Sequence, residues 1–466
     1  MHQHLLGASV PDRKTSTIFN FQTEQFCYLH WKQINEAYDD KNALGRLRVR
    51  VRIIMIILSL VFFHIFFCQS SKGEICATPS PPTHIFKESV HNLAPREDFI
   101  SRTSIQPGHI HELVFVVRQQ NMDKLTDILH DVSNPASPNY GQYMSVEQVY
   151  AMTLNPVARD AIVNYLHSNG ASVTSEILSG DLITATAPLS VWEKVLDTEF
   201  YTFHQMQPEG EIYQGVGAEM YSIPRELDPH LDSVLNVIEM PYHVSLPTRS
   251  RSRSYSLPGD RRSKGGFKMQ ESDPPGYLRP QEIRAYYNLS DVYGSAESTQ
   301  AAVAFGKNYF SPKSLANFQR YISFQKLQPA LLFGGFVSDN PLDDSGEGNL
   351  DVQYLMGISP GSPTTFWYNN GGYGSFLYEV LNTPNPPLVL SLSYGLQESQ
   401  TSAGTHRYVT TSAKKLGIIG VTLVVASGDD GAVGTDARST PPKCDYQPYF
   451  PAGNPYFTAV GATMVR

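Results

Sequence analysis

The chain has 466 residues, of which 41% are hydrophobic and 17% charged, and its formal net charge at pH 7 is −8. These values exclude a wholly disordered, collagen-like or coiled-coil chain, and the acidic balance argues against a nucleic-acid-binding protein. The length predicts about two or three domains, each large enough to bury its own core. The four cysteines have neither the spacing of a zinc site nor the density of a disulfide scaffold. We therefore predict no metal site within the chain.

Near the N-terminus a basic stretch, residues 46–52, precedes an apolar run, residues 53–68. This order is typical of a signal peptide, and a signal anchor in the membrane is the alternative. We predict an N-terminal extension over 1–45, a signal peptide or signal anchor over 46–76, and entry into the secretory pathway. An extension before a signal is unusual, so translation from Met55 or retention as a membrane anchor would each explain it.

Residues 81–246 mix strand and helix patterns. The expected strands are 112–117, 171–177 and 182–187, and the expected helices are 122–129, one opening at a capping box on Ser145, 157–166 and 191–196. The order strand, helices, strand, strand, helix predicts a compact α+β unit of the ferredoxin-like kind. None of its residues has a catalytic pattern.

Residues 247–275 contain a basic run, Arg249-Ser-Arg-Ser-Arg253, several Gly and Pro, and almost no aliphatic side chains. Such a stretch cannot bury enough apolar surface to offset the entropy lost on ordering. We therefore predict an exposed linker that proteases can cut.

Residues 276–466 alternate apolar runs with helical patterns. The runs 301–305, 388–392 and 421–426 are each followed by Gly or Ser. Unbroken apolar runs are typical of strands that are covered on both faces, which predicts a parallel sheet flanked by helices. Sites in such sheets lie beyond the carboxyl ends of the strands.

The first candidate site is a pair of acids, Glu347 and Asp351, which would lie one turn apart on one face of a helix. Like charges at this spacing repel each other. The pair is therefore either solvated, which the spacing alone favours, or it raises one pKa for proton transfer.

Two further candidates follow predicted strands. Asp429 and Asp430 lie in a turn bracketed by glycines, where a carboxyl group could face a substrate, although Asp and Gly are also ordinary turn formers. Ser393 and Gly395 lie at another strand end, whose backbone could bind an extended substrate.

Together these clusters and other motifs occur in a recognisable order. The order is Glu347, Asp351, Ser393-Tyr-Gly395, Ala426-Ser-Gly-Asp429, Phe450-Pro-Ala-Gly-Asn-Pro-Tyr-Phe457 and Val460-Gly-Ala-Thr463. In this order they resemble the serine-carboxyl peptidases, or sedolisins. Residues 280–289 resemble the start of that family's catalytic domain, and residues 133–144 resemble part of its activation propeptide.

The resemblance implies a subtilisin-like α/β catalytic domain with a parallel sheet, preceded by an activation propeptide and active at acidic pH. It makes Glu347 the general base for a serine nucleophile, Asp351 the residue that orients it, and Asp429 the oxyanion donor. A carboxylate can act as a base at a pH where histidine is protonated, and a protonated Asp can donate to an oxyanion. The implied partners are peptide or protein substrates and the chain's own propeptide.

The family's nucleophile lies in a Ser-Gly-Thr-Ser motif after the Phe-Pro-Ala segment, and residues 1–466 contain no such motif. We therefore expect a C-terminally incomplete peptidase domain over 276–466, inactive as it stands. A non-catalytic peptide-binding protein and a propeptide-like inhibitor are the two alternatives. The family also binds calcium, whose ligands we expect beyond residue 466.

Asn288-Leu-Ser290 is an N-glycosylation sequon, which fits secretory passage if it is exposed. The sequence leaves open the lysosome, the vacuole and the extracellular space. It also leaves open whether the enzyme trims tripeptides from free N-termini or cuts internally.

Overall fold

The computed structural model describes residues 83–90, 99–176, 180–206, 212–238, 278–306, 308–323, 326, 328–335, 337–339, 346–369, 371–434 and 446–463. All of them belong to one compact unit, Pro82–Arg466. The predicted extension 1–45, the signal segment 46–76 and the linker 247–275 lie outside the described residues. No helix within the described ranges is both long enough and apolar enough to cross a membrane.

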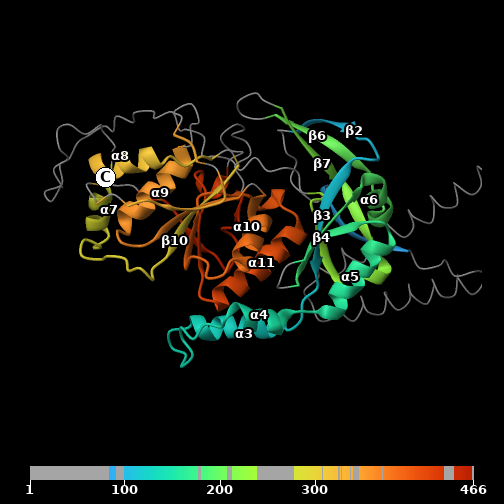
Figure 1. Ribbon diagram of the computed structural model, residues 1–466, viewed down its shortest axis with the longest axis horizontal. Coiled ribbons are helices and arrows are strands. Elements are labelled where there is room, and N and C mark those ends of the chain that lie inside the picture. The colour runs from blue at the N-terminus through green and yellow to red at the C-terminus, as the bar shows by residue number, and fades with distance from the viewer. Residues whose placement is uncertain are drawn as a thin grey trace, which may run out of the picture. The chain divides into compact units, whose positions relative to one another are not determined.

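Four antiparallel strands form the main sheet of the N-terminal region, in the order β4-β5-β3-β9. Their bounds are β3 Ile110–Val117, β4 Ser172–Glu176, β5 Leu182–Pro188 and β9 Leu231–Leu235. Helices connect β3 to β4 and follow β5, so the topology is that of a ferredoxin-like α+β unit (Figure 1). The ferredoxin-like prediction is confirmed.

The predicted helices of this region are present as α3 Met122–Ser133, α4 Val146–Thr153, α5 Pro156–Ser168 and α6 Leu189–Leu196. Ser145 and Gln148 form the predicted capping box at the start of α4. Ile162 of α5 and Trp192 of α6 share one buried cluster with Phe115 of β3. Burial of this shared apolar surface stabilises the unit.

Further strands in this region were not predicted. A three-stranded antiparallel sheet contains β2 Phe99–Ser104, β6 Phe200–Met206 and β7 Ile212–Ala218, and β1 His84–Ser89 pairs with β8 Met220–Pro224, before the short helix η2 Arg225–Leu227. Strands β1 and β2 pair with partners about a hundred residues away or more, as in the His84–Pro224 and Ser104–Tyr201 pairs. Periodicity within one segment cannot reveal such pairings.

Six parallel strands form the sheet of the C-terminal region, in the order β11-β12-β10-β13-β15-β17. Their bounds are β10 Gln300–Phe305, β11 Leu331–Phe333, β12 Thr364–Asn369, β13 Val389–Leu392, β15 Thr422–Ala426 and β17 Thr458–Val460. The three predicted strands are β10, β13 and β15, which are neighbours in the sheet. The prediction of a subtilisin-like α/β domain with a parallel sheet is confirmed, and the strands end at one edge.

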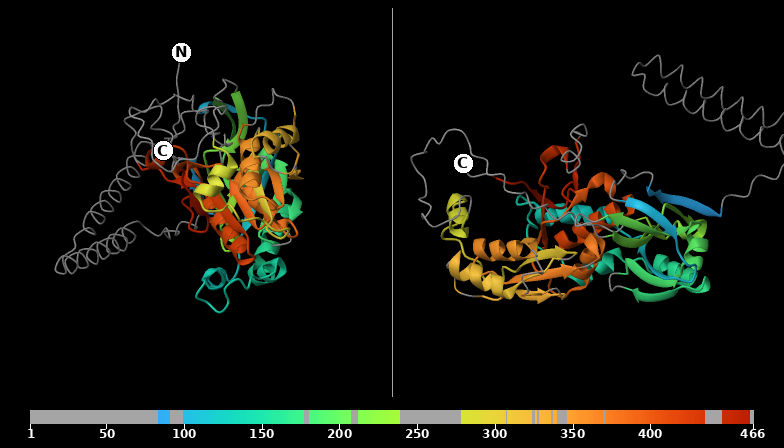
Figure 2. Two further views of the ribbon diagram at one scale, coloured as in Figure 1. Left: turned by 90° about the vertical axis from the view of Figure 1, so that its left-hand side faces the viewer. Right: turned by 90° about the horizontal axis from the view of Figure 1, so that it is seen from above.

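Helices cover both faces of this sheet. The helices of the region are α7 Pro280–Tyr286, α8 Pro312–Tyr321, α9 Gly346–Ile358, α10 Gly372–Asn382 and α11 Ala403–Ile418, with the short elements β14 Leu396–Gln397, η3 Glu398–Gln400, η4 Gly431–Val433 and β16 Tyr449–Phe450. Val352 of α9 packs with Ala302 on one face, and Val409 of α11 packs with Val303 on the other. This region is the yellow-to-red part of the ribbon in Figure 2. Burial from both sides explains the unbroken apolar sequence of β10.

The N-terminal sheet contacts helices α10 and α11. Val116 and Leu235 belong to one buried cluster with Tyr408 of α11, and Leu125 of α3 packs with Ile418 at the end of the same helix. The Tyr150 hydroxyl also donates to the carbonyl oxygen of Leu381. The two regions therefore share apolar core as well as hydrogen bonds.

A buried ion pair lies in this contact. Lys415 Nζ is 2.8 Å from Asp181 Oδ2, and the two side chains are 0% and 1% exposed. Gln119 Nε2 donates to the same Asp181 oxygen at 2.8 Å. Because taking charges out of water is costly, such a pair is tolerated only while each charge keeps its partner.

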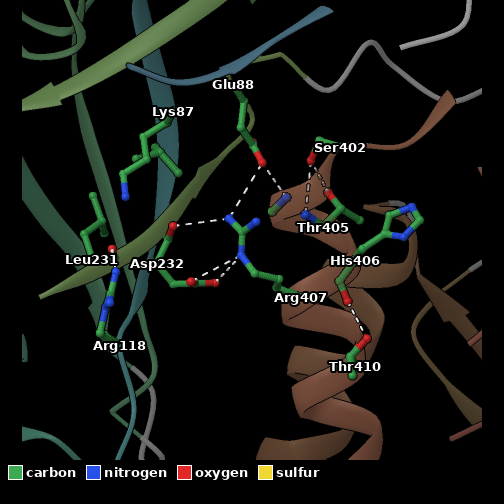
Figure 3. Close-up of polar contacts among 12 residues, drawn as sticks. Lys87, Glu88, Arg118, Leu231, Asp232, Ser402, Thr405, His406, Arg407 and Thr410 are labelled. Carbon is green, nitrogen blue, oxygen red and sulfur yellow. Dashed lines mark hydrogen bonds and ion pairs between the residues drawn. The ribbon is translucent and has the colours of Figure 1, made fainter. Parts of the chain in front are cut away.

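A second polar contact lies at the start of α11 (Figure 3). Glu88 Oε1 accepts a hydrogen bond of 2.5 Å from the backbone N–H of Gly404, in the first turn, where helix N–H groups have no partner within the helix. Arg407 Nε lies 3.1 Å from Asp232 Oδ2, and its Nη2 lies 3.7 Å from Glu88 Oε1. Burial raises the pKa of Glu88, while the hydrogen bond from Gly404 and the charge of Arg407 lower it.

We expect Lys415→Ala to lower the free energy of unfolding by about 3–5 kcal/mol, because Asp181 would keep a buried charge without its partner. Lys415→Met combined with Asp181→Leu should recover most of this loss. Lys124→Ala, at an exposed lysine of α3, serves as the control and should change little. Urea unfolding at pH 7 measures all three variants, and equal losses for the single and double variants would contradict the ion-pair interpretation.

Candidate active site

Helix α9 presents the predicted acid pair, Glu347 and Asp351, one turn apart. Val352 and Met356 anchor the helix in the core beneath it. At Gly348 a Cβ would lie 2.6 Å from the carbonyl oxygen of Tyr309. Glycine therefore allows the first turn of α9 to lie directly against the loop that follows β10.

Residues from three elements meet at the carboxyl edge of the sheet. Ser393, directly after β13, donates from Oγ to Asp351 Oδ1 at 2.9 Å and also hydrogen-bonds the Glu347 carboxyl group. Asp429, after β15, is close enough for its negative charge to act on Glu347. The structure thus brings together Glu347, Asp351, Ser393 and Asp429, which are separated by up to 82 positions in sequence.

The acid pair is not a solvated helix face, which its spacing alone favoured. Asp351 is half-buried, and its Oδ2 atom is buried without a partner of ordinary hydrogen-bond geometry among the described residues. Burial raises the pKa of Asp351 well above its usual range, the negative charge of Glu347 raises it further, and the Ser393 hydrogen bond opposes both. Asp351 is therefore the member of the pair that keeps a proton.

Glu347 is in a more balanced environment. Burial raises its pKa, an interaction with the Asp351 side chain lowers it, the charge of Asp429 raises it, and the Ser393 hydrogen bond lowers it. Two neighbouring carboxyl groups rarely ionise together. The favoured arrangement has the proton on Asp351 and the negative charge on Glu347, so Glu347 is the one able to accept a proton.

The strand end at 393–395 is held by aromatic side chains that the sequence analysis did not identify. The Tyr373 hydroxyl donates to the carbonyl oxygen of Tyr394, and the Tyr394 ring packs against Phe305. At Gly395 a Cβ would lie 2.7 Å from Tyr449 Cδ1, which explains the glycine there. In the sequence, the aromatic residue Tyr394 directly after the predicted strand was the signal that could have indicated this packing.

The turn after β15 places Asp429 at the surface. Gly428 before it has a φ of 92°, a conformation that favours glycine, and Asp430 precedes η4. The Asp429 side chain is exposed whereas Glu347 is half-buried. A group bound at this edge could therefore contact Asp429 from solvent while it faces Glu347.

The sequon residue Asn288 lies 59 positions before Glu347 in the sequence. It follows α7, is exposed, and has a φ of 56°. As for metals, the described part of the chain contains no cluster of three or more His, Cys, Asp or Glu able to hold an ion.

Several known proteins are similar to this chain. Residues 97–240 match the family described as Pro-kumamolisin, activation domain. Tripeptidyl-peptidase 1 of Dictyostelium discoideum is 27% identical over 460 residues, covering 90% of this chain and 73% of that protein. The Homo sapiens tripeptidyl-peptidase 1 is 29% identical over 380 residues, covering 79% and 64%. A Pseudomonas sedolisin structure is 23% identical, with a TM-score of 0.32, covering 39% of this chain and 52% of that one.

Residues 97–240 are therefore similar to a pro-kumamolisin activation domain. Over most of its length the chain is similar to tripeptidyl-peptidase 1. It spans 64% of the length of the human relative. The fold assignment rests on the strand order described above.

We expect Asp351→Asn to stabilise the protein at pH 7. A carboxyl group whose folded pKa is raised contributes stability below its unfolded pKa, about 4, and this contribution is lost as the pH rises through the folded pKa. Asn cannot ionise, so the variant's gain over the wild type should be large at pH 7 and small at pH 4, about 1.4 kcal/mol per unit of pKa shift. Thermal unfolding at both pH values measures it, with exposed Asp291→Asn as control; a gain equal at both values would contradict the protonation state given for Asp351.

Proposed function

We propose that the protein is an acid-acting serine-type peptidase, made as a zymogen, in which Glu347 is the general base. The observation that carries this proposal is the meeting of two acids on α9 with the Ser393 hydroxyl, which lies 2.9 Å from Asp351 Oδ1 at the edge of a parallel sheet. Asp429 is close enough to act on Glu347. The similarity to tripeptidyl-peptidase 1 and the matched activation domain support the proposal. Peptides or proteins are the substrates.

In this proposal Glu347 removes the proton from a serine hydroxyl as it attacks the peptide carbonyl carbon. At mildly acidic pH a histidine base would be protonated and inactive, whereas a carboxylate remains available. The proton on Asp351 supports the negative charge on Glu347 before the attack. The neighbouring Ser393 hydrogen bond serves the same charge.

Asp429 takes the part of oxyanion donor. As the carbonyl oxygen gains negative charge, a protonated carboxyl group nearby can donate a hydrogen bond to it, which an ionised carboxylate cannot do. Asp430 is the next residue in the chain.

The rest of the chain fits a zymogen. The ferredoxin-like unit acts as the activation propeptide, and the basic stretch 247–275 is the place where it is cut from the peptidase domain. Asn288 is exposed and available for glycosylation. Passage through the secretory pathway to an acidic compartment such as the lysosome follows from the proposed pH range.

We expect Glu347→Gln to reduce peptidase activity at acidic pH by at least about 100-fold, because a general base contributes that much or more. The assay uses fluorogenic peptides with free and with blocked N-termini, which separates tripeptide release from internal cleavage. Glu297→Gln, at an exposed glutamate, should retain activity. Residues 1–466 contain no Ser-Gly-Thr-Ser motif, so the transcript is first sequenced from its 3′ end, and any longer protein that it encodes is assayed beside the 466-residue chain.

Full activity of Glu347→Gln would overturn the assignment of the base. If neither protein cuts any peptide but both bind peptides, the protein is a non-catalytic peptide-binding member of the family. If neither cuts peptides and the chain slows another sedolisin, it is a propeptide-like inhibitor.

We expect acidification of the purified zymogen to produce its first cut within 247–275, because a basic, polar stretch offers cleavable backbone. Mass spectrometry of the early fragments locates the cut. Replacing Arg249, Arg251 and Arg253 by Gly or Ser tests whether the basic side chains determine where the chain is cut. If exposure alone determines it, the position of the cut will not change. A first cut elsewhere, with this stretch intact, would count against the zymogen proposal.

A further inference from the structure

Ser393 lies where strand β13 meets the two acids of α9. Its hydroxyl donates to Asp351 Oδ1 at 2.9 Å and also hydrogen-bonds the Glu347 carboxyl group. A hydroxyl group has one proton to donate and lone pairs that accept. When Asp351 is ionised the hydroxyl donates to it. When Asp351 holds the proton, the hydroxyl can accept from Asp351 while it donates to the ionised Glu347, and so link both acids to the sheet.

The strand end that carries Ser393 is rigid. The next residue, Tyr394, is 2% exposed, and its ring lies 5.3 Å from that of Phe305 in an edge-on contact. Its carbonyl oxygen accepts the Tyr373 hydroxyl. Glu347, in contrast, lies in the first turn of its helix, where the backbone has fewer hydrogen bonds to hold it. The sheet is therefore the firmer support for the acid pair.

We propose that Ser393 is a positioning residue, whose side-chain hydroxyl holds Asp351 and Glu347 in one arrangement from the end of β13. The effect of Ser393 on catalysis rests on the proposed function. Its hold on the two acids does not depend on that function. It assigns the Ser393 side chain a part distinct from the backbone contact with substrate that the sequence suggested.

The groups that face this hydroxyl determine how its removal would act. Glu347 and Asp351 on α9 contact it directly. Asp429, after β15, acts on Glu347, and both α9 acids act on the neighbouring Tyr394. All of these groups are neutral or negative. The Ser393 hydrogen bond lowers the pKa of both α9 acids, so it favours their ionised forms and matters most when one of them is charged.

The first test needs no enzyme activity. Thermal unfolding of the wild-type chain, Ser393→Ala, Ser393→Thr and Ser391→Ala is measured at pH 7 and at pH 4. We expect Ser393→Ala to lower the melting temperature more at pH 7 than at pH 4, and Ser393→Thr, which keeps the hydroxyl, to restore most of the loss. Ser391→Ala, two residues earlier on β13, should act equally at both pH values. An equal loss at both values for Ser393→Ala would overturn the proposal.

The second test uses the active peptidase. Ser393→Ala should move the acidic limb of the kcat/KM profile to higher pH by about one unit, the equivalent of one hydrogen bond to a charged group. An unshifted limb in an active enzyme overturns the proposal even if kcat falls. If the protein has no peptidase activity, the proposed function fails, and the unfolding data alone decide the inference.

Ser393→Ala that folds at pH 4 but not at pH 7 would support the proposal, since protonated acids do not need the hydroxyl. If it folds at neither pH, the cycle of Ser393→Cys, whose thiol is only a weak donor, Asp351→Asn and the double variant decides. Independent effects in that cycle would overturn the link between the two side chains.

Discussion

The parallel direction of the six-stranded sheet is the constraint on which the site depends. Strands that run the same way end at the same edge, so residues that follow different strands come together there. Ser393 follows β13 and Asp429 follows β15, its neighbour in the sheet. Helix α9 lies over the adjacent β10 and β12, which adds Glu347 and Asp351 to the same edge. Three separate pieces of chain thus form one cluster of acids.

Burial then gives these acids unequal properties. A carboxyl group that loses water without gaining donors holds its proton more tightly. Asp351 lies deeper and keeps a proton, whereas Glu347 lies nearer the opening and can be charged. Both residues carry a carboxyl group, so their environments decide which one holds a proton and which one can accept a proton. The cost is a pair of half-buried carboxyl groups that weakens the fold at neutral pH, as functional sites often do.

Charged groups are also buried where the N-terminal region, residues 83–238, contacts helix α11. Asp181 forms a fully buried ion pair with Lys415, and Glu88 accepts a backbone hydrogen bond at the start of the helix. Because burial raises the pKa of Glu88, its contribution to stability is present at low pH and is lost as the pH rises through its folded pKa. Acidification therefore does not weaken the contact through Glu88. Cleavage between the two regions is a more direct way to separate them.

The sequence by itself predicted some of the elements and singled out the acids Glu347 and Asp351. Local periodicity is enough to locate β10, β13, β15 and the helices α3 to α6, and the order of the motifs resembles that of the sedolisins. Only the tertiary structure decided that Asp351 is half-buried, that the Ser393 side chain reaches it, and that Lys415 pairs with Asp181. The strands β1 and β2 were missed for the same reason, since their partners are far away in the chain. Burial and long-range contact depend on the whole fold, and no local pattern in the sequence reports them.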